Sequence, residues 1–408
     1  MTGLAEGTGG PAFTPHLLEF TEDPLPAYRW LRDEAPVFHV ESEDIWILSR
    51  YHDVVTAARD WHTFSQRESV GYSRVKDARP VLTATDPPQH TELRSHTAAL
   101  FTPRAVDTWR VEMEALLDQL LDAAFSAAGP VNFAEDVANP YLSRLVGRLM
   151  GIPEEDQRAI KEGATATSLV MSGDFSQPAV DRRAAFGAYF DRFVQQRAAD
   201  FEANGTCPGP FTERLFQPSP SGRHLSHDER VPYQTLLATG GNETTAQLLS
   251  NLTLVLAEQP WILDVLRERP ELRPSVVEEA LRFVSPVTGM FRHTTTPVER
   301  HGVTIPHDAK VLLMYGAANH DERHYDRPDD FVVDRYPRGF ADADHVSFTT
   351  GIHVCLGGHL ARLLINVFLE RLAERIDTIE IAGPVVRSSN ALVRVIDDLP
   401  VVLTPRAR

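Results

Sequence analysis

The sequence predicts a mainly α-helical protein with small, mostly peripheral β-sheets, and two observations lead to this fold class. From about residue 107 onward, most segments repeat apolar residues at the three- and four-residue spacing of an α-helix, whereas segments with a strand pattern are short. The composition, 42% hydrophobic and 24% charged over 408 residues, is typical of a folded soluble chain. Length alone favours two or three domains.

The individual elements follow from local patterns. Residues 1–12 are rich in glycine and are expected to be flexible. Residues 36–50 predict a β-hairpin, since two apolar extended runs flank a polar turn. A helix is predicted over 107–128, with Asp107 as its N-cap, and 208–221 is predicted to be a surface loop. Further helices are predicted at 154–171, 180–203, 226–257, 274–284 and 356–376, and short strands within 302–315 and 378–403.

Charge and cysteine content exclude several classes of function. Lys and Arg number 40 and Asp and Glu 57, a formal charge of −17, so nucleic acid and anionic membrane surfaces are not expected partners. The two cysteines, Cys207 and Cys355, cannot form a disulfide framework or hold an all-cysteine iron–sulfur cluster. With no signal peptide or membrane-length apolar run, the expected location is the cytoplasm.

The segment around Cys355 carries the strongest chemical signal. Cys355 comes just before an apolar helix, where free backbone N–H groups and the helix dipole would stabilise a thiolate. Gly351, Gly357 and Gly358 leave room for a flat cofactor near the backbone. A lone cysteine is more often a buried structural residue. Zinc would need about four ligands, whereas haem iron needs a single thiolate from the protein.

The string F-x-x-G-x-H-x-C-x-G, which runs from Phe348 to Gly357, resembles the haem-ligand loop of the cytochrome P450 monooxygenases. The resemblance implies that Cys355 is the thiolate ligand of a haem b iron. It extends from the hairpin near Pro36 to the C-terminal strands, which implies a single P450 domain over 1–408 rather than two domains. The sequence departs from the family at Thr349, where many members have glycine.

A second motif lies within the predicted helix 226–257. Two adjacent glycines, Gly240 and Gly241, are unfavourable in a helix, which predicts a kink or a widened turn. With Glu243 and Thr244 they resemble the oxygen-activation motif of the family. The resemblance implies that the glycines open a groove for dioxygen, with Gly241 beside the haem. It also implies that Glu243 feeds protons and that Thr244 donates a hydrogen bond on the oxygen side.

Glu279 and Arg282 are three residues apart on a predicted helix, and such a pair is ordinarily a surface ion pair. They resemble the E-x-x-R motif of the family, which a later arginine completes, and Arg335 is the matching candidate. The resemblance assigns all three to fold maintenance and haem incorporation.

The candidate partners of the two haem propionates are histidines and arginines. Asp86 begins a segment that resembles the D-P-P-x-H-x-x-x-R helix start of the family, with His90 and Arg94 one helical turn apart. Arg292 and His353 match the other propionate-binding positions. Buried carboxylates need cationic or hydrogen-bonding partners, which these four residues would provide.

The reaction implied by the resemblance is insertion of one oxygen atom from dioxygen into a C–H bond of a hydrophobic small molecule. No flavin, nicotinamide or cluster motif is visible, so electrons are expected from a ferredoxin and its ferredoxin reductase. An acidic ferredoxin would dock on a basic patch beside Cys355, for which His359, Arg362, Arg104 and Arg110 are candidates.

The substrate is expected to lie against apolar side chains, and a natural-product tailoring hydroxylation is the favoured reaction. Oxidation or O-demethylation of a small aromatic acid is an alternative. A peroxide-driven peroxygenase, a haem protein without turnover, and a helical binding protein without haem also stay open. The expected pocket walls are Leu169, Val170, Met171, Leu237, Ala238, Val287, Met290 and Phe291.

Overall fold

The computed structural model describes residues 14–16, 22–67, 70–73 and 81–407, and the fold is mainly α-helical with small sheets, as predicted. The expected flexibility of residues 1–12 lies outside the described residues. The helices are α2 (Leu25–Asp33), α3 (Tyr51–Arg59), α4 (Gln89–Thr97), α5 (Pro103–Asp107), α6 (Arg110–Phe125), α7 (Asn139–Met150), α8 (Gln157–Met171), α9 (Gln177–Asn204), α10 (Pro210–Phe216), α11 (His227–Glu258), α12 (Trp261–Glu268), α13 (Arg273–Val284), α14 (Tyr315–Asn319) and α15 (Gly358–Arg375).

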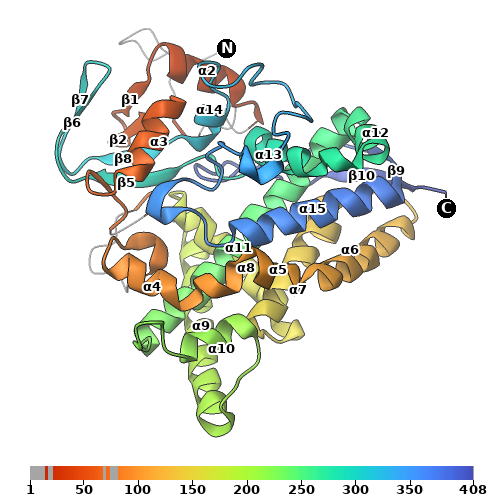
Figure 1. Ribbon diagram of the computed structural model, residues 1–408, viewed down its shortest axis with the longest axis horizontal. Coiled ribbons are helices and arrows are strands. Elements are labelled where there is room, and N and C mark those ends of the chain that lie inside the picture. The colour runs from red at the N-terminus through yellow and green to blue at the C-terminus, as the bar shows by residue number, and fades with distance from the viewer. Residues whose placement is uncertain (1–13, 17–21, 68–69, 74–80, 408) are drawn as a thin grey trace.

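The strands form three sheets, of which the largest stands beside α2, α3 and α14 at one side of the molecule (Figure 1). Its order is β1-β2-β8-β5-β3, and the predicted hairpin is its β1–β2 pair, with Val40 opposite Ile45. The strands are β1 (Val37–Val40), β2 (Ile45–Leu48), β3 (Phe64–Ser65), β4 (Val131–Asn132), β5 (Met290–Thr294), β6 (Val298–Arg300), β7 (Val303–Ile305), β8 (Lys310–Leu313), β9 (Ile376–Ile381) and β10 (Pro400–Pro405).

The helical body is organised around α11, which packs against α7, α8 and α9, while α15 packs against α6, α12 and α13 (Figure 1). Helix α11 begins with a capping box: Ser226 accepts from the backbone of Glu229, whose carboxylate accepts from the Ser226 N–H at 2.9 Å. The largest apolar cluster joins α6, α7, α11, α13 and α15. Burial of these faces, rather than helix propensity, holds the helices together.

Three predictions about local structure were wrong. Helix α6 begins after Trp109, because Asp107 ends the separate short helix α5. The expected loop 208–221 contains α10, whose Phe211 and Leu215 are buried. Helix α11 continues as α-helix through Gly240 and Gly241, so the expected widened turn does not form.

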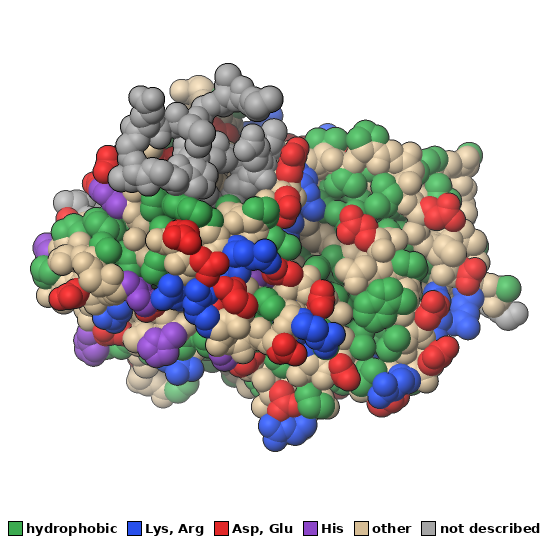
Figure 2. Space-filling model, turned by 90° about the horizontal axis from the view of Figure 1, so that it is seen from above, with side chains coloured by type: hydrophobic (Ala, Val, Ile, Leu, Met, Phe, Trp, Pro, Cys, Tyr) green, Lys and Arg blue, Asp and Glu red, His purple; other side chains and the backbone are tan. Residues whose placement is uncertain are grey.

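Acidic and basic side chains are interspersed on the face that Figure 2 shows, and hydrophobic side chains gather on one half of it. The formal charge of −17 is therefore not concentrated in one acidic surface on this face.

Candidate functional site

Cys355 lies in the long connection between α14 and α15, where backbone hydrogen bonds hold it. Its N–H donates to the carbonyl of Phe348 at 3.0 Å, and its own carbonyl accepts from the Gly358 N–H at 3.3 Å. A short 3₁₀ turn, Gly351–His353, precedes it, and α15 begins at Gly358. Cys355 therefore lies just before the helix N-terminus, close to the predicted position.

Cys355 is exposed and is one of the residues that line a cavity. The cavity has a volume of about 590 Å³. It is lined by α4, α5, α3, the Cys355 loop and the start of α15, including Tyr51, Val55, Arg59, Arg94, Phe101, Pro103, Phe340, Phe348, Thr349, Val354, Leu356, Gly358, His359 and Arg362.

Burial raises the pKa of the Cys355 thiol, although a hydrogen bond from Gly357 and the nearby Arg94 and Arg362 guanidinium groups act to lower it. The backbone at the helix start thus acts to lower the thiol pKa, as expected, while burial acts more strongly in the opposite direction. A bound metal ion deprotonates a coordinating thiol. The absent side chain of Gly357 leaves its Cβ position 4.0 Å from the sulfur, which fits the approach of a flat cofactor.

The four predicted propionate partners come together from three separate elements. The rings of His90, on α4, and His353, in the cysteine loop, have centroids 4.4 Å apart. Arg94 donates to the carbonyl of Val354 at 2.8 Å, which ties α4 to the cysteine loop. Arg292 enters from β5 and is 1% exposed. The structure therefore gathers cationic and imidazole groups beside Cys355.

The chemistry of this cluster fits a ligand with carboxylate groups. Within the described part of the chain, the buried Nε2 of His90 has no hydrogen-bond partner. Burial and the positive charges of His353 and Arg94 lower the pKa of His90 to about 4. A carboxylate would supply the missing partner and offset the charges of Arg94 and Arg292. The residues present therefore fit a haem with two propionates.

Two polar residues of this cluster were missed by sequence reasoning. With the Gln66 amide oriented by its surroundings, its oxygen accepts from both Arg292 nitrogens at 2.6 and 2.7 Å, and its nitrogen donates to His353 Nδ1 at 2.8 Å. The Asp86 carboxylate lies 3.7 Å from His353 Nε2 and accepts a hydrogen bond from Ser65. Asp86 stands in the quoted motif, whereas Gln66 is in no motif.

Glu243 and Thr244, both on α11, have different hydrogen-bond partners. The Thr244 hydroxyl donates to the carbonyl of Gly240 at 2.7 Å. The buried Glu243 carboxylate accepts from the Thr165 hydroxyl of α8 at 2.9 Å. Burial raises the pKa of Glu243, and the bond from Thr165 and the charge of Lys161 only partly oppose this. Glu243 is thus a buried acid that a neighbouring helix orients.

The two glycines of α11 have different surroundings. Among the described residues, nothing lies within 4 Å of the position where Gly240 would carry a Cβ, so open space adjoins that side of the helix. The corresponding position of Gly241 lies 3.1 Å from Val146 of α7. Gly241 therefore allows close packing of two helices, which corrects its predicted place beside the cofactor.

The predicted pocket walls divide into two groups. Leu169, Met171, Leu237, Val287 and Met290 are partly exposed, and Val170 is buried. The prediction that Ala238 and Phe291 are pocket walls was wrong.

Ala238 is 0% exposed and lies in the apolar core. It stands two positions before Gly240, a rotation of roughly 200° about the helix axis, so it faces away from Gly240. Phe291 is 0% exposed and packs with Tyr28 and Leu31, on the opposite face of β5 from Arg292.

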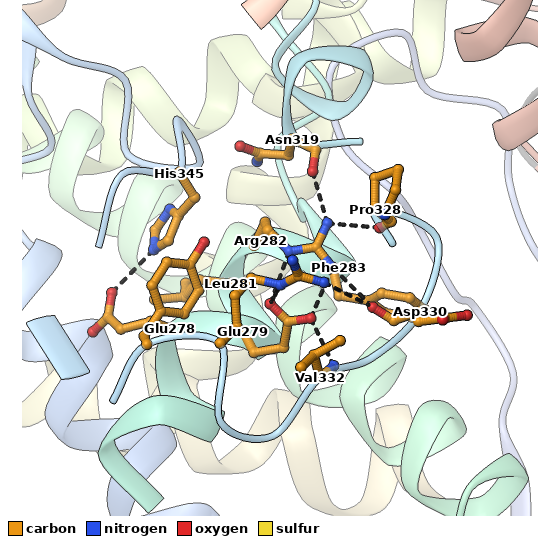
Figure 3. Close-up of polar contacts among 12 residues, drawn as sticks. Glu278, Glu279, Leu281, Arg282, Phe283, Asn319, Pro328, Asp330, Val332 and His345 are labelled. Carbon is orange, nitrogen blue, oxygen red and sulfur yellow. Dashed lines mark hydrogen bonds and ion pairs between the residues drawn. The ribbon is translucent and has the colours of Figure 1, made fainter. Parts of the chain in front are cut away.

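Glu279 and Arg282 form a buried ion pair (Figure 3), and the partly exposed Arg335 extends it to an ionic cluster of three residues. Arg282 donates two hydrogen bonds to Glu279, both at 2.8 Å, and Arg335 donates a third at 2.9 Å. Arg282 also binds the carbonyls of Asn319 and Pro328 at 2.7 Å. The pair is therefore fully buried and connects α13 to the segments before the cysteine loop, unlike an ordinary surface ion pair.

The expected basic patch beside Cys355 is largely neutralised. Arg362 makes a bidentate ion pair with the buried Glu278, which also contacts His345 at 3.0 Å (Figure 3). Arg110 contacts three acidic side chains, among them Glu114. The prediction that these two arginines are free to dock an acidic partner was therefore wrong.

His359 and Arg104 differ from those two arginines. Burial and the charge of Arg362 lower the pKa of His359, which disfavours its protonated form. Arg104 is exposed.

Over the described residues, no group of three or more His, Cys, Asp or Glu side chains could hold a metal ion. In the same part of the chain, no helix has the length and apolar character needed to cross a membrane.

Comparisons with known proteins point to one family. A family model described as Cytochrome P450 matches residues 167–379. The "Beta-dihydromenaquinone-9 omega-hydroxylase" of Mycobacterium tuberculosis is 34% identical, covering 97% of this chain and 79% of that protein. A solved structure described as bacillaene polyketide synthase cytochrome P450 PksS of Bacillus subtilis is 27% identical, with a TM-score of 0.85 and coverage of 96% and 100%. A mutant of P450 EryK in complex with erythromycin B is 28% identical, with a TM-score of 0.83 and coverage of 95% and 99%.

Proposed function

This chain belongs to the cytochrome P450 family of haem-thiolate monooxygenases, and we propose that it hydroxylates a hydrophobic natural product as a tailoring step. Its enzyme class is that of oxidoreductases that use haem, dioxygen and redox partners. We further propose that residues 1–408 act as one catalytic domain, in the cytoplasm, where its two unpaired cysteines stay reduced.

The observation that carries the proposal is the placement of Cys355 beside four propionate partners. Cys355 and Arg94 line the cavity, while His90, Arg292 and His353 gather beside Arg94 and the cysteine loop. We assign Cys355 as the iron ligand and the other four residues as propionate partners. When bound, the haem supplies the activation of dioxygen, and a thiolate ligand favours O–O cleavage.

The residues of α11 are proposed to manage protons. Glu243 is buried and its pKa is raised, so it holds a proton more readily than an exposed glutamate. The Thr244 hydroxyl lies beside the open space at Gly240. We assign Glu243 as the proton donor and Thr244 as the hydrogen-bonding residue of the oxygen site. Glu279, Arg282 and Arg335 are assigned to stability.

The substrate proposal rests on the partly exposed apolar side chains and on the relatives. We retain as pocket walls Leu169, Val170, Leu237, Val287 and Met290. One relative is named as a hydroxylase of a menaquinone, and the EryK structure holds erythromycin B. Both are natural products with large apolar parts, which supports a tailoring hydroxylation over a small polar substrate.

A ferredoxin and a ferredoxin reductase are proposed to deliver the two electrons. Arg59 lines the cavity and Arg104 follows its lining residue Pro103; both are exposed, and they replace Arg362 and Arg110 as docking candidates. An acidic partner would bind them by charge, so reduction should slow markedly at high salt. Reduction that is insensitive to salt would contradict this docking site.

The decisive experiment is the absorption spectrum of the reduced, carbon monoxide-bound protein, followed by turnover in labelled dioxygen. We expect the band typical of thiolate ligation and one labelled oxygen atom in the product. Full haem loading without that band would overturn the assignment of Cys355. Haem binding with no product under any electron supply would favour a haem protein without turnover.

Two comparisons separate the remaining alternatives. A screen for substrate-induced spectral shifts, run with terpenoids, polyketides and small aromatic acids, distinguishes the two substrate classes. Turnover with peroxide alone, compared with turnover with the ferredoxin system, distinguishes a peroxygenase. Thr244→Ala should keep haem binding but divert electrons to peroxide; an unchanged yield of product per electron would contradict its role.

A further inference from the structure

We propose that Tyr315 is a positioning residue for the haem-ligand loop. Its hydroxyl holds Thr349 in a strained backbone conformation, and Thr349 lies in the same loop, six residues before Cys355. The inference rests on the assignment of Cys355 as the iron ligand. It concerns a residue that no motif singles out.

Thr349 adopts a backbone conformation that is unfavourable for a threonine. Its φ angle is +53°, in the left-handed region that favours glycine, and its side chain is β-branched. Glycine would adopt this φ without strain, so a threonine here needs a compensating interaction. A conformation of this kind persists where the surroundings determine it.

The hydroxyl of Tyr315 supplies that interaction. Tyr315 begins α14, is 2% exposed, and donates to the Thr349 hydroxyl oxygen at 3.0 Å. The Arg292 guanidinium donates to the same Tyr315 oxygen at 3.4 Å. Because arginine has no acceptor, Tyr315 must accept from Arg292, and its one proton is therefore directed to Thr349.

A second side chain of α14 holds the same segment. Asn319 lies four residues after Tyr315, on the same face of the helix. Its amide nitrogen donates to the Ser347 hydroxyl at 2.9 Å, and its amide oxygen accepts from the Val346 N–H at 2.8 Å. Helix α14 thus fixes residues 346–349 at two points, and Tyr315 is the point nearer to Cys355.

The contacts of Tyr315 also form part of a closed polar path. From Arg292 the path continues through Gln66 to His353, two residues before Cys355. Thr349 and His353 therefore hold both sides of the turn at Gly351. A change at the Tyr315 hydroxyl should reach the iron ligand through Thr349 and a propionate partner through Arg292.

The test compares Tyr315→Phe, which keeps the buried ring and removes only the hydroxyl, with the wild-type holoenzyme. Two readouts besides turnover are the rate of haem transfer to an excess of a haem-free globin and the reduced, carbon monoxide-bound spectrum. Loss of one buried hydrogen bond predicts a roughly fivefold faster haem loss. It also predicts a larger fraction of protein without the thiolate band.

Thr349→Gly provides the sharper comparison. Glycine adopts a positive φ without help, so the double variant Tyr315→Phe with Thr349→Gly should lose haem more slowly than Tyr315→Phe alone. Tyr189→Phe is the matched control. Tyr189 lies on α9, and its hydroxyl donates to the Asp156 carboxylate at 2.9 Å. This variant should behave as the wild type in both readouts.

The outcomes separate this inference from the proposed function. If the wild type has no thiolate band, the assignment of Cys355 is overturned. If the wild type has the band and Tyr315→Phe matches it in both readouts, the role of Tyr315 is overturned. If Tyr315→Phe loses haem faster but Thr349→Gly gives no rescue, Tyr315 does not act through Thr349, and the proposal is again overturned.

Discussion

The hydroxyl of Thr165 on α8 donates a 2.9 Å hydrogen bond to the carboxylate of Glu243 on α11. The two residues are 78 positions apart in the chain, and the contact orients a buried acid whose pKa is raised by burial. Glu243 reaches toward α8, whereas Thr244 bonds back to Gly240.

Thr165→Val should reduce the yield of product per electron, because it removes the hydroxyl that orients Glu243 while keeping the shape of the side chain. We expect roughly a tenfold loss, less than the hundredfold or more that a positioned acid–base group contributes, because Glu243 itself is retained. The measurement is product and peroxide formed per electron consumed, together with the solvent isotope effect. Thr165→Ser keeps the hydroxyl and should stay close to the wild type. Equal yields from the Val and Ser variants would show that the contact has no part in proton delivery.

Glu243→Gln should stabilise the fold at high pH more than at low pH. Because the pKa of Glu243 is raised on folding, the stability from this group is complete below its unfolded pKa and is lost as the pH rises through the folded value. Glutamine removes that dependence. Denaturant unfolding at about pH 5 and about pH 8 should therefore show a larger gain for the variant at the higher pH.

A matched control for this pH dependence is Glu162→Gln. Glu162 lies on the exposed side of α8, where its side chain is 54% exposed and pairs with Arg158. Its effect on stability should be small at both pH values. A gain for Glu243→Gln that does not change with pH would contradict the assignment of a raised pKa.

Cys355→Ser should abolish the thiolate band, and Cys207→Ser should leave it intact. Cys207 is 7% exposed and packs in the apolar cluster of α9 and α10, and burial raises its pKa to about 11. It is therefore an inert thiol away from the cavity. The reduced, carbon monoxide-bound spectrum of each variant is the measurement, and loss of the band in Cys207→Ser would refute the assignment.

Glu279→Ala should destabilise the fold by about 3–5 kcal/mol, because it leaves Arg282 buried without its partner. Arg335→Ala should cost less, since Arg335 is 11% exposed and Glu279 keeps its two bonds from Arg282. Unfolding in denaturant, with haem content measured alongside, tests the order of the two effects. Arg158→Ala, whose side chain is 90% exposed, is the neutral control. An equal loss from the first two variants would contradict this ranking.

Local sequence was sufficient to predict the fold class, the cysteine loop and the motif residues that stand close together in the chain. Helical spacing predicted the bounds of α8, α9, α11, α13 and α15 to within a few residues. The i,i+3 spacing of Glu279 and Arg282 likewise ensured that they could pair. These features are local, and local backbone geometry follows from residue type and spacing.

The direction of each side chain and its distant partners came from the packing of the whole molecule. That packing turned Ala238 and Phe291 into the core, paired Arg362 with Glu278, and placed Gly241 against α7. It also joined Tyr315 to Thr349 and Gln66 to Arg292. Such contacts depend on how packed helices and strands are rotated and shifted against one another, and that arrangement is set by burial of the whole core rather than by any single segment.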